Sequence, residues 1–245
     1  MSLSSSGEGV CCHCGASGEL QAVFSGQGNS SILLCPECLD GFLAARELNS
    51  LFYGGNDTIK EGVRLILRGL NEMYHIDLQN LHLVQTPQRV SRMFAELCSG
   101  YYFNPDIFLK VRYPVQGSPG LIVVRDIEFT SLCVHHLSTI VGKVHVGYVP
   151  GQWYVGLSKI ARVADAYARR LQIQELMTDE IADCIQRGLS PQGVMVVVEA
   201  RHDCMCKRGV TKPDALTVTS AVRGVFFDNT KDTKGELLHL LLRGD

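Results

Sequence analysis

The segment GLIVVRDIEFTSLCVHH, from Gly120 to His136, joins the two features that decide the fold and the chemistry of this chain. Its first part is rich in β-branched and apolar residues, which predicts a β-strand over 120–133. Its end places one cysteine and two adjacent histidines where that strand should finish. We therefore expect a candidate metal site near the end of a strand.

The sequence around this segment alternates between strand and helix patterns. The predicted elements are strands at 120–133 and 143–151, helices at 158–172 and 178–189, and strands at 193–204 and 216–227. The order strand, strand, helix, helix, strand, strand predicts an α+β fold, with an antiparallel four-stranded sheet and both helices on one face. We place this core at 121–245.

A helical part should precede the core, at 58–120. From Thr58 to Tyr74, apolar residues recur at helical spacing. A second helix is predicted to begin at TPQRV, with Thr86 as its N-cap and Pro87 at the first helical position, and to end at about Cys98.

The composition is that of an ordinary globular protein. The chain has 245 residues, 46% of them hydrophobic, which suits one large domain or a domain with a small module. Its formal net charge of −2 gives the whole chain no electrostatic footprint for nucleic acid or an anionic membrane. The longest apolar run, VMVVV, is far shorter than the roughly 20 residues that span a bilayer, and no secretory signal is visible. We therefore expect a cytoplasmic protein with no nucleic-acid or membrane partner.

The N-terminal region carries two Cys-x-x-Cys motifs separated by a segment that suits a short hairpin. Four thiolates come from Cys11, Cys14, Cys35 and Cys38. Paired motifs of this kind predict a structural zinc ion, because each motif supplies two thiolates to one tetrahedral site. In a reducing compartment such clusters are more often metal ligands than disulfides. We expect a zinc-ribbon-like module at 1–48, followed by a linker at 49–57.

The cluster CVHH is matched downstream by a second one, EARHDCMCKRG. Together, Cys133, His136 and Cys204 would form a zinc site with three protein ligands and a fourth position open to water, which is typical of catalytic zinc. The remaining histidines, His135 and His202, would flank that position and exchange protons near neutral pH.

From Leu83 to the C-terminus, the sequence resembles GTP cyclohydrolase I. The matching segments are TPQRV, FTSLCVHH, GKVHVGYVPG, GLSKIARVADAYARRLQIQE, EARHDCMCKRGV and TVTSAVRG. The resemblance implies that GTP and water are converted to formate and dihydroneopterin triphosphate, the first step of folate and pterin biosynthesis. It also implies the same roles as the residues alone: zinc held by Cys133, His136 and Cys204, and proton transfer by His135 and His202.

The resemblance further implies a set of contacts to the triphosphate. Ser158, as a helix N-cap, and Lys159 and Arg162 in the first turn would lie near backbone N–H groups suited to phosphate. Arg89 and Arg208 match further phosphate contacts, and the guanidinium fork of an arginine can donate to two phosphate oxygens at once.

For the guanine base, the resemblance implies contacts from Glu175 and its neighbour Gln174. An ionised carboxylate accepts two parallel N–H bonds, so Glu175 would select bases that carry those donors. Both residues come just before Thr178, where the sequence predicts a new helix, so a break before it would present them in a pocket.

Family resemblance also implies an assembly. In the tunnelling fold, the four-stranded sheets of several subunits form a barrel and pack as a toroidal decamer. Active sites then lie between subunits, so a neighbouring chain could supply Arg89. Residues 1–48 separately resemble the zinc-binding domain of the ClpX chaperone, in CCHCG and LLCPECLDGF, which implies a protein partner for this module.

Two features depart from the family pattern. The family has Cys-Glu-His-His, whereas this chain has Val134 in place of the glutamate, and Thr139 and Ile140 replace a Pro-Phe pair. If the segment is extended, Val134 points away from the ligands and only an outer carboxylate is lost. Cys206 would share a strand face with Cys204 in an extended chain and could compete with it as a ligand.

Three functions are consistent with these residues. The first is a working GTP cyclohydrolase I. The second is a diverged zinc-dependent purine nucleotide cyclohydrolase that gives a ring-opened or different pterin product, an alternative that Val134 alone supports. The third is a non-catalytic assembly or adaptor protein, which would not need His135 and His202.

Overall fold

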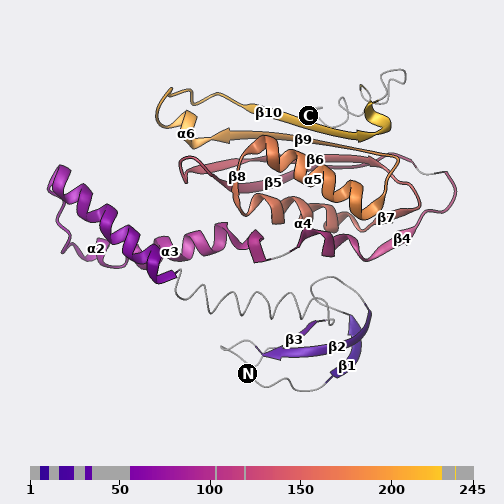
Figure 1. Ribbon diagram of the computed structural model, residues 1–245, viewed down its shortest axis with the longest axis horizontal. Helices are drawn as coiled ribbons and strands as arrows, with labels where there is room; N and C mark the ends of the chain where they lie inside the picture. The colour runs from indigo at the N-terminus through magenta and orange to yellow at the C-terminus, as the bar shows by residue number, and fades with distance from the viewer. Residues whose placement is uncertain are drawn as a thin grey trace.

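A five-stranded sheet forms the centre of the computed structural model, and a helical arm extends from its side (Figure 1). The structure describes residues 56–102, 104–118, 120–227 and 235, together with the backbone of 6–10, 17–24 and 31–34. The strands of the central sheet are β5 (Ile122–Cys133), β6 (Thr139–Val149), β8 (Leu171–Gln172), β9 (Gly193–His202) and β10 (Thr217–Gly224).

The strand order is β10-β9-β6-β5-β8, and the first four strands are antiparallel. The antiparallel four-stranded sheet predicted from the sequence is therefore confirmed. The edge strand β8, which runs parallel to β5, was not predicted. Helices α4 (Leu157–Ala168) and α5 (Gln174–Leu189) both cover one face of the sheet, which confirms the α+β architecture (Figure 1).

The main core lies between this sheet face and the two helices. Every second residue of β9, Val194, Val196 and Val198, is fully buried beneath them. From the helices come residues at helical spacing, Ile160, Val163 and Tyr167 in α4 and Met177, Ile181 and Ile185 in α5. Burying each such side chain contributes about 1.5–3 kcal/mol.

The opposite face of β9 is also covered. Met195 and Val197 pack with Phe226, which belongs to the short helix η3 (Val225–Phe227). Burial on both faces explains the uninterrupted apolar run of this strand, since alternation is needed only where one face meets water.

The helix boundaries differ from the prediction at the link between α4 and α5. The predicted helix 158–172 ends at Ala168, because Leu171 and Gln172 pair with the end of β5 instead. Helix α5 begins at Gln174, not at Thr178. Ser158 was predicted as the N-cap of α4, but the cap is Gly156 and Ser158 lies inside the first turn.

The helical part consists of residues 56–74, α2 (Leu81–Val84) and α3 (Thr86–Leu97). Helix α3 is capped by Gln85, so Thr86 is its first residue rather than its cap. The two longer helices are joined by the Ser91 hydroxyl, which donates to the backbone carbonyl of Asn56 at 3.2 Å. Most of the apolar residues that predicted the first helix are not buried within one chain.

Short elements connect these parts. They are η1 (Ser99–Tyr102), η2 (Pro105–Leu109), and a two-stranded ribbon of β4 (Arg112–Pro114) and β7 (Trp153–Val155). No helix within the described residues is long and apolar enough to cross a membrane.

Near the N-terminus, β1 (Ser6–Val10), β2 (Ser17–Phe24) and β3 (Ser31–Leu34) form a three-stranded sheet. The antiparallel pairing of β2 with β3 confirms the predicted hairpin. The predicted zinc ligands at 11, 14, 35 and 38, and the linker at 49–57 up to residue 55, lie outside the described residues.

Candidate metal centre and active site

The first part of the site is the turn that follows β5. Cys133, the last residue of the strand, accepts the backbone N–H of Leu137 at 2.8 Å and donates its own N–H to Ser138 at 2.8 Å. Leu137 adopts a left-handed conformation, with φ 52°, to close this turn. The predicted strand end at Cys133 is confirmed. The condition of an extended backbone at Val134 is not met, so the spacing of Cys133 and His136 comes from a turn.

The second part of the site is the end of β9. His202 is the last residue of that strand and pairs with Ile140 of β6. The chain then turns into the single-turn helix α6 (Asp203–Cys206). The predicted strand therefore ends before Cys204, so Cys204 and Cys206 no longer alternate along an extended backbone.

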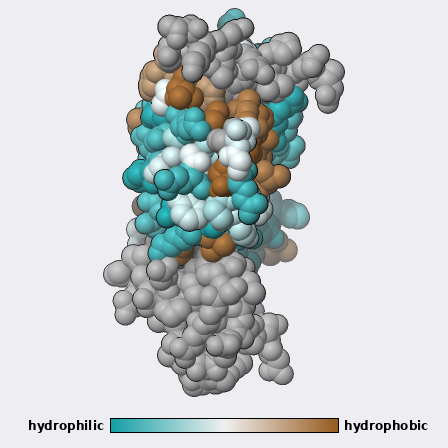
Figure 2. All heavy atoms as spheres, turned by 90° about the vertical axis from the view of Figure 1, so that its right-hand side faces the viewer, coloured by the Kyte–Doolittle hydropathy of each residue, from teal (hydrophilic) through white to brown (hydrophobic). Residues whose placement is uncertain are grey.

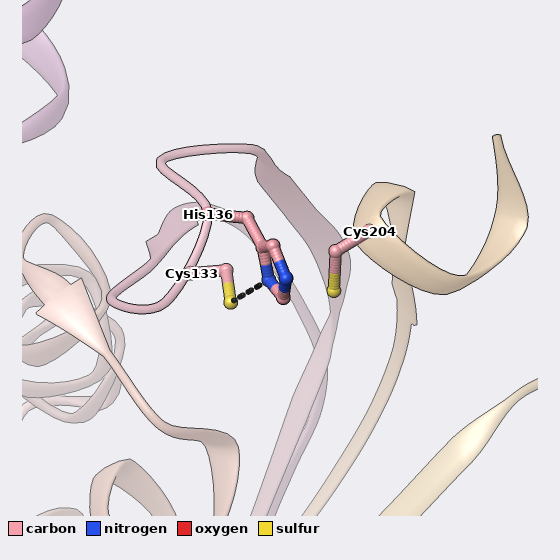
Figure 3. Close-up of side chains that lie close together, drawn as sticks. All are labelled: Cys133, His136 and Cys204. Carbon is pink, nitrogen blue, oxygen red and sulfur yellow. Dashed lines mark hydrogen bonds between the residues drawn. The ribbon is translucent and has the colours of Figure 1, made fainter. Parts of the chain in front are cut away.

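These two parts bring the three predicted ligands together (Figure 3). The ligand atoms of Cys133, His136 and Cys204 all lie within 4.8 Å of one another. The Sγ atom of Cys133 is 3.7 Å from Nδ1 of His136, and the imidazole lies between the two cysteine side chains in the close-up view. Among the described residues, no other group of three or more metal-ligating side chains meets this criterion.

The chemistry of the three side chains fits zinc, which prefers thiolate and imidazole ligands. Cys133 is buried and Cys204 is half-buried. Burial raises the pKa of the Cys204 thiol, and the neighbouring Cys133 raises it further. A divalent cation between the two sulfur atoms would offset both effects, because it stabilises the thiolate form.

His202 ends β9, two residues before Cys204 in the chain, and is held from the helix side. Its Nε2 atom is 2.7 Å from Oε1 of Gln174, the first residue of α5. Burial lowers the pKa of His202, while the nearby carboxylate of Glu175 acts in the opposite direction. The imidazole is thus fixed by the start of a helix that packs on its own strand.

His135 lies in the turn after β5 and is exposed. Its Nδ1 atom is 3.9 Å from Sγ of Cys133, and its ring meets the ring of His136 edge-on at 6.2 Å between centroids. His135 therefore contacts two members of the ligand group.

A polar link near the site was not foreseen from the sequence. The Thr139 hydroxyl, at the start of β6, donates to the carboxylate of Asp203, and Lys207 donates to the same carboxylate at 3.0 Å. Both contacts lower the pKa of Asp203. Thr139 is one of the departures from the family pattern, but a single sequence gave no sign that it would face Asp203.

The predicted phosphate contacts are spread over three helices. Ser158, Lys159 and Arg162 lie in or next to the first turn of α4, Arg208 lies just after α6, and Arg89 is exposed on α3. Glu175 is exposed in the first turn of α5, whereas its neighbour Gln174 is buried. Neither α4 nor α5 has a side-chain hydrogen bond from its N-cap residue, Gly156 and Ile173 respectively.

Comparison with known proteins agrees with this geometry. The family model described as GTP cyclohydrolase I matches residues 59–241. The protein named GTP cyclohydrolase 1 from Chlorobium chlorochromatii (strain CaD3) is 42% identical over 185 residues, covering 76% of this chain and 81% of its own length.

Two further relatives carry the same name. The one from Clostridium perfringens (strain ATCC 13124) is 45% identical and is matched over 71% of this chain and 91% of its own. The one from Parabacteroides distasonis (strain ATCC 8503) is 46% identical, over 67% of this chain and 84% of its own. With the family model covering most of the chain and the two histidine and cysteine clusters brought together as described, this chain belongs to the GTP cyclohydrolase I family.

Proposed function

We propose that this chain converts GTP and water to formate and 7,8-dihydroneopterin triphosphate, the first step of folate and pterin biosynthesis. The observation that carries the proposal is the convergence of Cys133, His136 and Cys204 in a chain of this family. His135 contacts this group, and His202 ends the strand that leads to Cys204. The reaction needs water to add to the imidazole ring of guanine, and it needs acids and bases to open that ring.

Cys133, His136 and Cys204 would hold a zinc ion. Zinc in such a site acts as a Lewis acid and lowers the pKa of a water molecule so that it can attack carbon at neutral pH. The turn after β5 and the helical turn α6 would position these three ligands.

The two remaining histidines would move protons. His202 would protonate the ring nitrogen next to the carbon that is attacked, and His135 would assist the breaking of the carbon–nitrogen bonds. His202 suits this role because its ring is held in one orientation, and well-oriented general acids contribute about 10²–10⁴-fold to rate.

Substrate recognition would use the first turns of α4 and α5. Ser158, Lys159 and Arg162 lie near the N-terminus of α4, where the positive end of the helix dipole favours phosphate, and Arg208 follows α6. Glu175, in the first turn of α5 and close enough to influence His202, would accept the N–H groups of guanine. Gln174 adjoins it.

We also propose that the chain works as a homo-oligomer, in the decameric form of the tunnelling fold with active sites between subunits. The support is apolar surface that one chain leaves uncovered. In the helical part, Leu65, Ile66, Met73 and Tyr74 are exposed. Figure 2 shows apolar side chains gathered beside polar ones at the end of the molecule that carries β4 and β7. Arg89, exposed on α3, would then reach the site of a neighbouring subunit.

The remaining proposals concern the N-terminal module and the compartment. Residues 1–48 would bind a second, structural zinc through Cys11, Cys14, Cys35 and Cys38, and would dock a protein partner. The cysteine-rich sequence supports a cytoplasmic location, where these thiols stay reduced.

The test is to incubate the purified, zinc-loaded protein with GTP and to follow formate release and, after oxidation, pterin fluorescence. We expect formate and pterin in equal amounts. Formate or a ring-opened product without pterin would instead support the diverged purine nucleotide cyclohydrolase, for which Val134 is the reason, since this exposed residue leaves the turn without a carboxylate. If neither product forms although zinc is bound, only the non-catalytic assembly remains.

A further inference from the structure

The side chain of Gln174 uses its whole carboxamide inside the protein. It is only 1% exposed. Its Nε2 atom lies 3.0 Å from the carbonyl oxygen of Val198, 3.1 Å from that of Thr217 and 3.1 Å from the hydroxyl of Thr219. Its Oε1 atom lies 2.7 Å from Nε2 of His202. This one side chain therefore links α5 to β9, to β10 and to the imidazole.

The orientation of the carboxamide follows from the chemistry of its neighbours. Two of the three groups around one end are backbone carbonyls, which can only accept hydrogen bonds, so the NH2 group must be at that end. The reverse orientation would set an amide oxygen against two carbonyl oxygens in a buried place, where unmade hydrogen bonds are costly.

The hydroxyl groups nearby agree with this orientation. Thr178 donates its single hydroxyl proton to the carbonyl oxygen of Gln174 at 2.7 Å. In its 2.7 Å contact with Thr219, Thr178 must therefore accept, and Thr219 donates. With its own proton engaged there, the Thr219 oxygen is left to accept from the NH2 group of Gln174.

The acceptor Oε1 of Gln174 therefore faces Nε2 of His202, and only a protonated Nε2 can complete that bond. We propose that Gln174 is a positioning residue that holds His202 in the tautomer with the proton on Nε2. Nδ1 is then the one ring atom that exchanges a proton with the substrate. Because the carboxamide is buried and engaged on all sides, it acts through His202 and not by touching guanine.

The consequence for the reaction rests on the proposed function. When His202 is protonated, the proton on Nδ1 passes to the guanine ring nitrogen, and the neutral ring that remains keeps its proton on Nε2. The next step can return a proton to the lone pair of Nδ1 without rotation of the ring. Without the bond to Gln174, part of the neutral His202 rings would carry their proton on Nδ1, and Nδ1 could then not accept the next proton.

The first test reads the tautomer directly. Histidine labelled with nitrogen-15 in the ring is incorporated into the full chain, and solid-state NMR is recorded on zinc-loaded protein without GTP at about pH 8, where histidine rings are neutral. The His202 signals are those that disappear in His202→Gln. We expect a protonated Nε2 and a bare Nδ1. A protonated Nδ1 on His202 in the unchanged protein would overturn the proposal, whatever the variants do.

The second test replaces the side chain by one of similar length without polar atoms, Gln174→Met. The matched control is Gln186→Met, the same change on the same helix, at a residue whose Nε2 donates only a long 3.5 Å bond to Pro191. We expect Gln174→Met to populate the other tautomer and to lower kcat by about 10²-fold, with KM for GTP changed little. An unchanged tautomer signal, or a loss confined to KM, would contradict the proposal.

The outcomes separate this proposal from the proposed function. If the protein does not turn GTP over, the NMR signals still report whether Gln174 sets the tautomer. If it turns GTP over normally while His202 carries its proton on Nδ1, the activity stands and only the positioning role of Gln174 fails. Should Gln174→Met not fold, the spectrum of the unchanged protein decides the matter alone.

Discussion

His202 and His135 are the two histidines proposed to transfer protons, and their surroundings in this chain differ. His202 ends a strand, is half-buried, and has its ring bonded to Gln174. His135 lies in a turn of exposed side chains, and its ring contacts Cys133 and His136. The first histidine is oriented by the sheet and by α5, whereas the second follows the turn.

The difference separates the side of the site that this chain holds through buried hydrogen bonds from the side that is exposed. On the β9 side, three elements meet around Gln174 and leave the imidazole one orientation. On the β5 side, Val134 and Leu137 are 40% and 50% exposed, next to His135. Exposed apolar side chains beside the proposed proton-transfer residue His135 fit the proposal that another subunit or the substrate covers this side. We therefore expect changes on the β9 side to act on chemistry and changes in the turn to act more mildly.

The largest effect should come from removing a ligand. Cys204→Ala leaves two protein ligands for zinc, too few for a stable site, so the zinc content should fall by about one ion per chain and activity should be lost. Metal analysis after gel filtration measures the first, and the GTP assay measures the second. A variant that keeps its full zinc content would show that Cys204 is not a ligand.

The direct comparison of the two histidines should give the next largest effect. His202→Gln should lower kcat by about 10³-fold, and His135→Gln by about 10²-fold, within the range for general acids. Both variants should keep their zinc, because neither ring belongs to the ligand group. Steady-state kinetics and metal analysis are the measurements. A larger loss from His135→Gln would reverse the ranking that burial and hydrogen bonding suggest.

A smaller effect is expected at the polar link between Thr139 and Asp203. This bond joins the start of β6 to the helical turn that carries Cys204, so it should help to fix the third ligand. Thr139→Val and Asp203→Ala should each weaken zinc affinity by about 10-fold, the lower end for outer partners of metal ligands. Competition with a chelator measures the affinity.

The double variant sharpens this prediction. If the two side chains act through their mutual bond, Thr139→Val with Asp203→Ala should be little worse than the more damaging single change, with a coupling of about 1 kcal/mol. Lys207→Met is the control, because its side chain is 75% exposed and such ion pairs contribute about 0–1 kcal/mol. Fully additive losses would show that the bond does not carry the effect.

Sequence patterns predicted the parts of this fold that depend on local periodicity. The strands, the two covering helices and the ligand group were found because their spacing repeats or because their residue types are chemically rare. The boundaries that failed depend on distant partners. The predicted helix continued through Leu171 and Gln172 because their backbone pairing with β5 leaves no mark in the local sequence.

The same limit applies to the site. The roles of Cys133 and His136 can be predicted because the residues lie three apart, but the link from Gln174 to His202 joins three elements that only the fold brings together. Glu175, the sequence neighbour of Gln174, is exposed. The two adjacent residues, which the family resemblance assigned together to guanine, therefore differ in burial. The sequence alone cannot reveal this difference in burial, because it depends on which way the first turn of α5 faces.

The smallest effect should come from Cys206, which the sequence left as a competitor of Cys204. Helix α6 separates the two side chains, and Cys206 does not belong to the ligand group. Cys206→Ser should therefore leave zinc content and kcat within about 2-fold of their original values, as expected for a change at a half-exposed residue away from ligands. If Cys206→Ser lost zinc while Cys204→Ala kept it, Cys206 and not Cys204 would be the third ligand. The metal would then lie elsewhere, and the ranking of His202 above His135 would lose its basis.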